Sequence, residues 1–323
     1  MLYVFYNDVD SNPCAALALA QLENPQVRVV PAGKRLFLFR NSFARLALHL
    51  GFRLKIPLML NFSRDFIRLV KGIKEEDSIL VFGSGICVSP RIAFPFFKIC
   101  KAKRRFKWVW DSVLDAEDEK WLLELKECFD VFTFDKSDAK KYGLTYKNTV
   151  CAEPPKAADS SAQGQDAAPA SGAVDLYFVG YDRGRYERLN ALFEKCAPMG
   201  LSCNFLVVRD ESSPSAEKSI PLMQKGIAPQ ENYKNLLEAR SVLDIPAQGQ
   251  HGLTQRTAEG LFLRKKIVTD NPFVKDEALF NEQNVFILGE RDTSELPSFI
   301  RSPFAPVDLK PYTINEWIKT FLS

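Results

Sequence analysis

Histidine is nearly absent from this 323-residue sequence, which contains only His49 and His251. Two histidines exclude a metal site built from several imidazoles, although magnesium held by carboxylates stays open. The seven cysteines are odd in number and scattered, and none forms a C-x-x-C pair. This spacing argues against a zinc site and against a disulfide framework. The histidines and cysteines thus predict no metal site, and we expect no cofactor.

Long apolar runs are also missing. No uninterrupted apolar segment approaches the roughly twenty residues that a membrane span needs. The N-terminal stretch "MLYVFYNDVD" is too short an apolar run, and too acidic after it, for a signal peptide. These absences lead us to expect a cytoplasmic protein.

The composition is that of a soluble globular chain long enough for two domains. Hydrophobic residues make up 46% of the sequence and charged residues 26%, and the formal net charge is +3. Residues 152–173 contain no aromatic or large aliphatic side chain, so they cannot bury enough surface to order themselves. We expect a first domain at residues 1–151, a flexible linker at 152–173, a second domain at 174–305, and a return segment at 306–323.

Both predicted domains show short β-branched or aromatic runs that alternate with helical patterns, which is typical of parallel sheets with crossover helices. Strands are predicted at residues 2–6, 78–83, 106–110, 131–134, 174–180, 204–208, 241–245, 266–270 and 284–288. The last segment, "PYTINEWIKTFLS", predicts a helix that begins after Thr313 and packs back on the first domain. The expected fold class is α/β, with two doubly wound, Rossmann-like domains facing a cleft that holds the ligand.

A polar loop follows the strand predicted at 241–245 and leads into a helix that carries Arg256 and Glu259. A helix N-terminus preceded by glycine offers backbone N–H groups and a positive dipole end to a phosphate. Arg256 would add a charge-assisted hydrogen bond, and Glu259 would accept hydrogen bonds from ribose hydroxyls. The alternative is a surface loop followed by an Arg/Glu ion pair on a solvated helix.

A second loop repeats this pattern in "YFVGYDRGRYERL", where Gly180 ends a predicted strand and Arg183, Gly184 and Arg185 precede a helix. Such a loop can hold a diphosphate. It contains neither G-x-G-x-x-G nor a P-loop motif, so an ordinary turn with exposed arginines is the alternative.

The stretches "FDVFTFDKSDAKKYGL", "VDLYFVGYDRGRYERL" and "SVLDIPAQGQHGLTQRTAEGLFLRKKIVTDN" together resemble bacterial GT-B glycosyltransferases of lipopolysaccharide, O-antigen and exopolysaccharide clusters, in the CgeB-like group. The resemblance covers the second domain and the end of the first. It implies that a nucleotide-sugar donor binds here. Glu259 would bind the ribose of the donor, and the loop and the start of the helix would bind its diphosphate. The implied donor-binding residues are Gly180, Arg183, Arg185, Gln250, Gly252, Leu253, Thr254, Arg256 and Glu259.

The same pattern usually has a second glutamate eight positions before the ribose-binding one, and here His251 stands in its place. His251 either bonds the donor phosphate or sugar, or caps the loop. Candidates for the base that takes the acceptor proton are Asp8 and Asp10 after the first strand, then Asp111 after the strand at 106–110. Asp135 is instead expected to cap a helix.

Residues 33–71 interleave nine basic residues with Phe, Leu and Ile, against the single acid Asp65. This stretch suggests peripheral contact with an anionic inner membrane that presents a saccharide or lipid-linked saccharide acceptor. The alternative is a set of helices whose basic face is solvated and whose apolar face packs on the sheet. Nucleic acid is not an expected partner, because no binding motif accompanies the charge.

The sequence thus predicts a metal-independent glycosyltransferase that moves a sugar from a nucleotide-sugar donor to a saccharide or lipid-linked acceptor. Arg185, Arg256 and the helix N-terminus would stabilise the departing diphosphate. Two alternatives stay open: a non-catalytic protein that binds sugar or nucleotide, and a sugar-nucleotide epimerase of the same architecture.

Overall fold

The computed structural model describes residues 1–6, 13–31, 64–82, 99–154 and 174–322, which form two compact units. The first unit comprises Met1–Ala152 and Thr313–Ser323, and the second comprises Glu153–Tyr312. Most of the predicted linker lies outside the described residues, as do Asp8 and Asp10.

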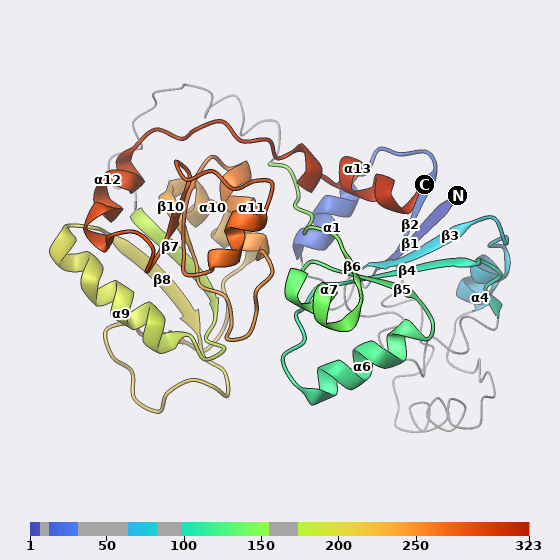
Figure 1. Cartoon of the computed structure of the whole chain (residues 1–323), viewed down its shortest axis with the longest axis horizontal. Helices are drawn as coiled ribbons and strands as arrows, with labels where there is room; N and C mark the ends of the chain where they lie inside the picture. Colours follow the sequence, from blue (N-terminus) through green and yellow to red (C-terminus); the bar gives the residue numbers. More distant parts are fainter. Residues whose placement is uncertain (7–12, 32–63, 83–98, 155–173, 323) are drawn as a thin grey trace. The chain divides into compact units, whose positions relative to one another are not determined.

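The first unit is built on a parallel sheet of order β2-β1-β3-β4-β5-β6 (Figure 1). Its strands are β1 (Leu2–Tyr6), β2 (Val27–Pro31), β3 (Ser78–Phe82), β4 (Arg104–Val109), β5 (Asp130–Thr133) and β6 (Thr145–Tyr146). The helices are α1 (Pro13–Ala20), α4 (Arg64–Lys71), α6 (Ala116–Lys126) and α7 (Lys136–Tyr142). Asp135 caps α7 as expected, because its carboxylate accepts hydrogen bonds from the backbone N–H groups of Ser137 and Asp138.

Alternate residues of these strands point to opposite faces of the first sheet, and each face has its own core. On one face, Phe66 and Val70 of α4 and Leu122 and Leu125 of α6 are buried with Phe5. The basic side chains of α4 are exposed. In this described part of the basic stretch, the apolar face packs on the sheet and the basic face is solvated.

The C-terminal segment covers the other face of the first sheet. It consists of α13 (Ile314–Trp317) and a 3₁₀ turn (Ile318–Phe321), which lie beside α1 (Figure 1). The Trp317 ring lies 5.2 Å from that of Trp108 and 5.5 Å from that of Phe82, and its indole N–H donates to the Asn148 carbonyl at 2.7 Å. The expected return of the C-terminus onto the first unit is therefore present.

The second unit has a parallel sheet of order β12-β11-β10-β7-β8-β9. Its strands are β7 (Val174–Tyr181), β8 (Cys203–Val208), β9 (Leu222–Met223), β10 (Ala239–Asp244), β11 (Lys266–Thr269) and β12 (Val285–Ile287). The helices are α9 (Tyr186–Cys196), α10 (Pro229–Glu238), α11 (Gln255–Phe262) and α12 (Leu296–Arg301). Helices α9 and α12 contribute to the core on one face, and α10 and α11 to the core on the other. The doubly wound α/β architecture is confirmed in both units.

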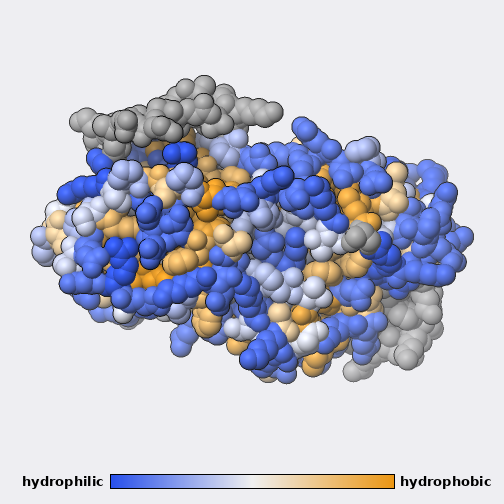
Figure 2. All heavy atoms as spheres, turned by 45° about the horizontal axis from the view of Figure 1, so that its top comes forward, coloured by the Kyte–Doolittle hydropathy of each residue, from blue (hydrophilic) through white to orange (hydrophobic). Residues whose placement is uncertain are grey.

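Polar and apolar residues are interspersed on the face shown in Figure 2. The large hydrophobic side chains that are exposed are scattered through the sequence: Met1, Leu17, Leu114, Leu123, Tyr181, Leu237 and Phe273. Among the described residues, no helix has the length and apolar character needed to cross a membrane.

We predict that Phe321→Ala destabilises the first unit by about 3–5 kcal/mol, because Phe321 is fully buried against Phe106, Phe132 and Trp317. All four tryptophans of the chain, Trp108, Trp110, Trp121 and Trp317, belong to this unit, so tryptophan fluorescence during denaturant unfolding reports it selectively. The exposed Lys319→Ala in the same segment should change stability by less than about 0.5 kcal/mol. Equal effects of the two substitutions would contradict the packing.

We also predict that the titration of Lys266 makes unfolding less favourable as pH rises above about 8. The buried Lys266 ammonium donates to the carbonyls of Gln283 and Pro303, and burial, with repulsion from Arg291, lowers its pKa to about 8. In the unfolded chain, a lysine has a pKa of about 10.4. Between pH values of about 8 and about 10.4, Lys266 therefore binds more protons in the unfolded state than in the folded state, and its contribution to stability increases with pH. Thermal melts from pH 8 to 10 isolate this contribution as a difference: the melting midpoint of the wild-type protein should rise relative to that of Lys266→Met, and the exposed Lys234→Met should follow the wild type.

Candidate functional site

The carboxyl ends of β7 and β10 diverge at the centre of the second sheet. The β7–β10 ladder pairs Val174 with Ala239 and stops at the pair Tyr177 and Val242, while both strands continue beyond it. From β7, the chain proceeds to β8 on one side and later returns to β10 on the other, so this is the point at which the strand order reverses. Doubly wound sheets bind ligands in the crevice outside such a point.

Arg256 of α11 bridges the two diverging strand ends. Its guanidinium Nη1 donates to the buried Asp244 carboxylate at 2.9 Å, and its Nη2 donates to the Val179 carbonyl of β7, also at 2.9 Å. The second oxygen of Asp244 accepts from the Thr257 hydroxyl at 2.7 Å. The sequence left open an Arg/Glu ion pair on a solvated helix. Arg256 does form an ion pair, but its partner is the buried Asp244 of β10.

Arg185 makes a second bridge at the same place. Its side chain is only 6% exposed, and it donates to the carbonyls of Tyr181 and Ile245. Burial, with repulsion from Arg256, lowers its pKa to about 9, so it remains protonated at pH 7. Both guanidinium groups lie over the Phe178 ring, at 5.3 Å for Arg185 and 4.8 Å for Arg256.

Gly180 makes room for this pair of arginines. A Cβ atom at this position would lie 3.0 Å from Nη2 of Arg256 and 3.4 Å from Nη2 of Arg185. A side chain would therefore displace at least one guanidinium group. The sequence-predicted residues Gly180, Arg185 and Arg256 form one cluster.

A pocket of about 560 Å³ opens next to this cluster, at the carboxyl ends of β7, β10 and β11. Its lining comes from the loop after β10, from the segment after β11, and from Gly184 and Arg188 at the start of α9. Two sequence-predicted residues, Gln250 and His251, belong to the lining.

Two local turns shape the lining of this pocket. Gln250 N–H donates to the Ala247 carbonyl and closes a four-residue turn. Gly249, the third residue of this turn, has a positive φ of 85°, which glycine adopts readily. Across the pocket, the Asn271 amide donates to the His251 carbonyl at 3.1 Å and accepts from the Phe273 backbone N–H at 3.1 Å. These bonds hold the rings of His251 and Phe273 with their centroids 4.7 Å apart.

The backbone N–H groups at the start of α9 already have protein acceptors. Arg183 and Gly184 both have positive φ, and their N–H groups donate to the Asp210 carboxylate and the Ser212 hydroxyl. The N–H groups of Arg185 and Tyr186 donate to the Asp182 carboxylate. A phosphate at this helix start would have to displace these partners.

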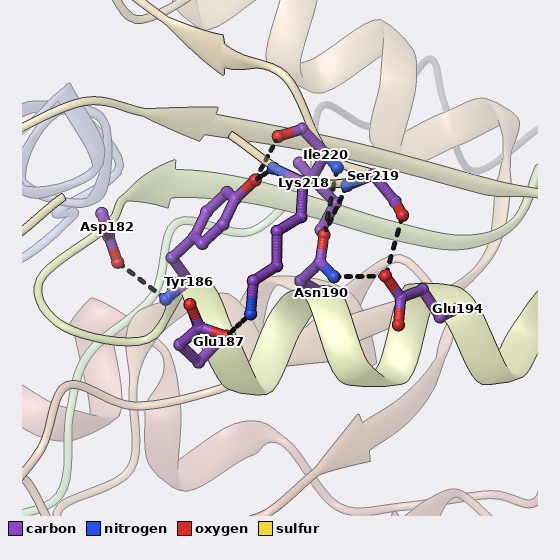
Figure 3. A network of polar contacts seen from close by, with 8 residues as sticks. All are labelled: Asp182, Tyr186, Glu187, Asn190, Glu194, Lys218, Ser219 and Ile220. Atoms are coloured by element: carbon purple, nitrogen blue, oxygen red, sulfur yellow. Dashed lines mark hydrogen bonds and ion pairs between the residues drawn. The ribbon is translucent and has the colours of Figure 1, made fainter. Parts of the chain in front are cut away.

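The segment between β8 and β9 carries Asp210 and Ser212. Nearer its end, this segment is hydrogen-bonded to α9 through the polar network in Figure 3. Tyr186 donates its hydroxyl to the Ile220 carbonyl and accepts from the Lys218 N–H, and Asn190 accepts from the N–H groups of Ser219 and Ile220. The arrangement around the α9 start is thus part of a continuous set of hydrogen bonds.

The start of α11 carries several of the sequence-predicted residues. Thr254 occupies the N-cap position without a side-chain capping bond, and its buried hydroxyl has no partner among the described residues. Leu253 packs in the core below, so it can offer a ligand only its backbone. Gly252 is buried, and Glu259 is half-buried in the second turn of α11.

Arg183 lies apart from these groups. It is exposed, and it lines a separate hollow of about 510 Å³ with Tyr181, Asp210, Glu211 and Ser212. The base candidate Asp111 is an exposed residue after β4, in the first unit.

Several residues of the pocket were not predicted from the sequence, among them Arg188, Asp270, Asn271 and Phe273. Asp270 and Asn271 directly follow β11, which the sequence predicts as a strand, so a search of every strand end for polar residues would have found them. Arg188 carried no signal because it follows Arg183 and Arg185 in a stretch that contains no recognised motif.

No family model matches this chain, and neither does any curated protein. Solved structures do match. The α,α-trehalose-phosphate synthase (UDP-forming) of Burkholderia xenovorans, in complex with glucose-6-phosphate, aligns with a TM-score of 0.58 at 11% identity, over 99% of this chain and 98% of that chain. The N-terminal domain of Candida albicans trehalose-6-phosphate phosphatase aligns with a TM-score of 0.51 at 11% identity, over 99% of this chain and 94% of that chain.

Identities this low establish likeness of fold and nothing finer. The chain is similar to these proteins across almost its whole length, and both of its units are doubly wound parallel sheets. This protein has the two-domain, Rossmann-like GT-B fold.

Proposed function

We propose that the protein is a glycosyltransferase that transfers a sugar from a nucleotide-sugar donor to a saccharide or a lipid-linked saccharide. The observation that carries this proposal is the pocket at the switch point of the second sheet, next to Arg185 and Arg256. In a fold of this type, a ligand is expected at this edge. The resemblance of residues 241–271 to transferases of lipopolysaccharide, O-antigen and exopolysaccharide clusters supports the same assignment.

In this scheme, the donor diphosphate lies at the start of α11, where the helix dipole and the first backbone N–H groups favour an anion. A diphosphate at the start of α9 would have to displace Asp182, Asp210 and Ser212 from the first N–H groups of that helix. Arg185 and Arg256 stabilise the charge of the departing diphosphate, and Glu259 binds the ribose. The proposal includes no metal or cofactor, since these groups supply the positive charge.

The acceptor belongs to the first unit. An inverting reaction needs a base there, and our candidates are Asp111 and, outside the described residues, Asp8 and Asp10. A retaining reaction needs no such base. His251, at the rim of the pocket, is placed by this proposal beside the sugar that is transferred.

A turnover assay tests the function directly. The protein is incubated with UDP-, GDP-, TDP- and ADP-sugars in the presence of lipopolysaccharide core or undecaprenyl-linked saccharide. Transfer of the sugar supports the proposal. Isomerisation of the donor would assign an epimerase, and nucleotide binding without any product would assign a binding protein.

We predict that Glu259→Ala weakens binding of the preferred nucleotide by about tenfold or more, because hydrogen bonds between a carboxylate and two ribose hydroxyls are lost. The melting midpoint should change little, since the Glu259 side chain is only half-buried. Calorimetric titration measures the affinity. The matched control is Glu231→Ala on the exposed side of α10, which should bind normally. Unchanged affinity in a folded Glu259→Ala protein would remove the ribose assignment.

A further inference from the structure

The pocket beside the two arginines has a balanced charge. Among its lining residues, Arg188 is the one guanidinium and Asp270 the one carboxylate, and the two form an ion pair at 2.6 Å. Arg188 also donates to the Pro246 carbonyl at 2.8 Å. Its positive charge is therefore committed to the protein, and the pair adds no net charge to the pocket.

An anionic group that entered this pocket would find no unpaired guanidinium among the lining residues, because Arg188 already pairs with Asp270. The side chain of Asp270 is 24% exposed, and burial raises its pKa even though Arg188 opposes the shift. A second carboxylate would add repulsion at short range in a partly desolvated site, where like charges interact more strongly than in water. The geometry thus disfavours a carboxylated ligand.

The remaining lining suits a neutral ligand that has hydroxyl groups. Gln248 and Gln250 carry amides, each of which both donates and accepts hydrogen bonds, as hydroxyl groups do. Phe273 is 42% exposed, and its ring lies beside that of His251. Exposed rings offer an apolar surface to the C–H face of a sugar.

We propose that this pocket binds an uncharged sugar and that Asp270 is the residue that selects against carboxylated sugars. This inference rests on the proposed function, because it names the class of sugar that the same site handles. Asn271 is a positioning residue in it, since both ends of its amide are used to hold the His251 and Phe273 segments together.

The test compares two probes, methyl β-glucoside and methyl β-glucuronide, by saturation-transfer NMR titration with the full chain at pH 7. The wild-type protein should bind the glucoside at least about tenfold more tightly. Asp270→Asn keeps the shape of the side chain, removes its charge and leaves Arg188 without its anion. It should therefore shift the glucoside-to-glucuronide preference by about tenfold or more toward the glucuronide.

Two further variants separate selection from a general structural effect. Adding Arg188→Gln to Asp270→Asn should abolish the gain in glucuronide binding, because the exposed cation is then lost. Glu282→Gln, on an exposed residue outside the pocket, should keep the wild-type preference. If Asp270→Asn weakened both sugars equally and left their ratio unchanged, Asp270 would have only a structural role and the inference would be wrong.

A parallel titration with UDP, GDP, TDP and ADP separates this inference from the proposed function. Nucleotide binding together with equal affinity for the two sugars, or with no sugar binding at millimolar concentration, would overturn the inference alone. The expected sugar preference without any nucleotide binding would support the pocket assignment and overturn the glycosyltransferase proposal. Absence of both kinds of binding would overturn both.

Discussion

The second unit depends on two guanidinium groups that join the ends of β7 and β10 after their ladder has stopped. Arg256 reaches the Val179 carbonyl and the Asp244 carboxylate, and Arg185 reaches the carbonyls of Tyr181 and Ile245. These bonds engage backbone carbonyls that lie beyond the end of the β7–β10 ladder. Burial, and then repulsion from Arg256, disfavour the charged form of Arg185 and lower its pKa. Asp244 and the face of the Phe178 ring offset that cost.

This arrangement limits how the arginines can act on a ligand. Because their described hydrogen bonds go to protein acceptors, a diphosphate would share these donors or feel their field, and it would not find a free bidentate fork. Among Arg185, Arg256 and Asp244, one positive charge is in excess. Such fixed charge in a partly buried place stabilises a developing anion without reorganisation. The structural and the proposed catalytic roles of the two arginines are therefore compatible.

The sequence predicted the parts of this unit whose signal is local. β-branched and aromatic runs located β7, β10 and β11, and the glycine and arginine pattern directed attention to Gly180, Arg185 and Arg256. The two-residue strands β6 and β9 are too short for any periodicity to reveal them. The pairing of Arg256 with Asp244 was hidden because Asp244 lies inside an apolar run, twelve positions earlier. The pocket lining depends on β11 lying next to β10, and adjacency of strands is a property of the tertiary fold.

The two parts of the site differ in charge, and this difference gives a ligand a direction. The cluster at Gly180 carries an excess positive charge, whereas Arg188 and Asp270 cancel within the adjoining pocket. A molecule with an anionic end and a neutral polyhydroxyl end would be oriented by these two environments before any specific hydrogen bond formed. A nucleotide-sugar has this distribution of charge, since its diphosphate is anionic and an uncharged sugar follows it. Under the proposed function, the charge of the arginine cluster therefore favours the anionic diphosphate, and the neutral ion pair in the pocket favours the uncharged sugar.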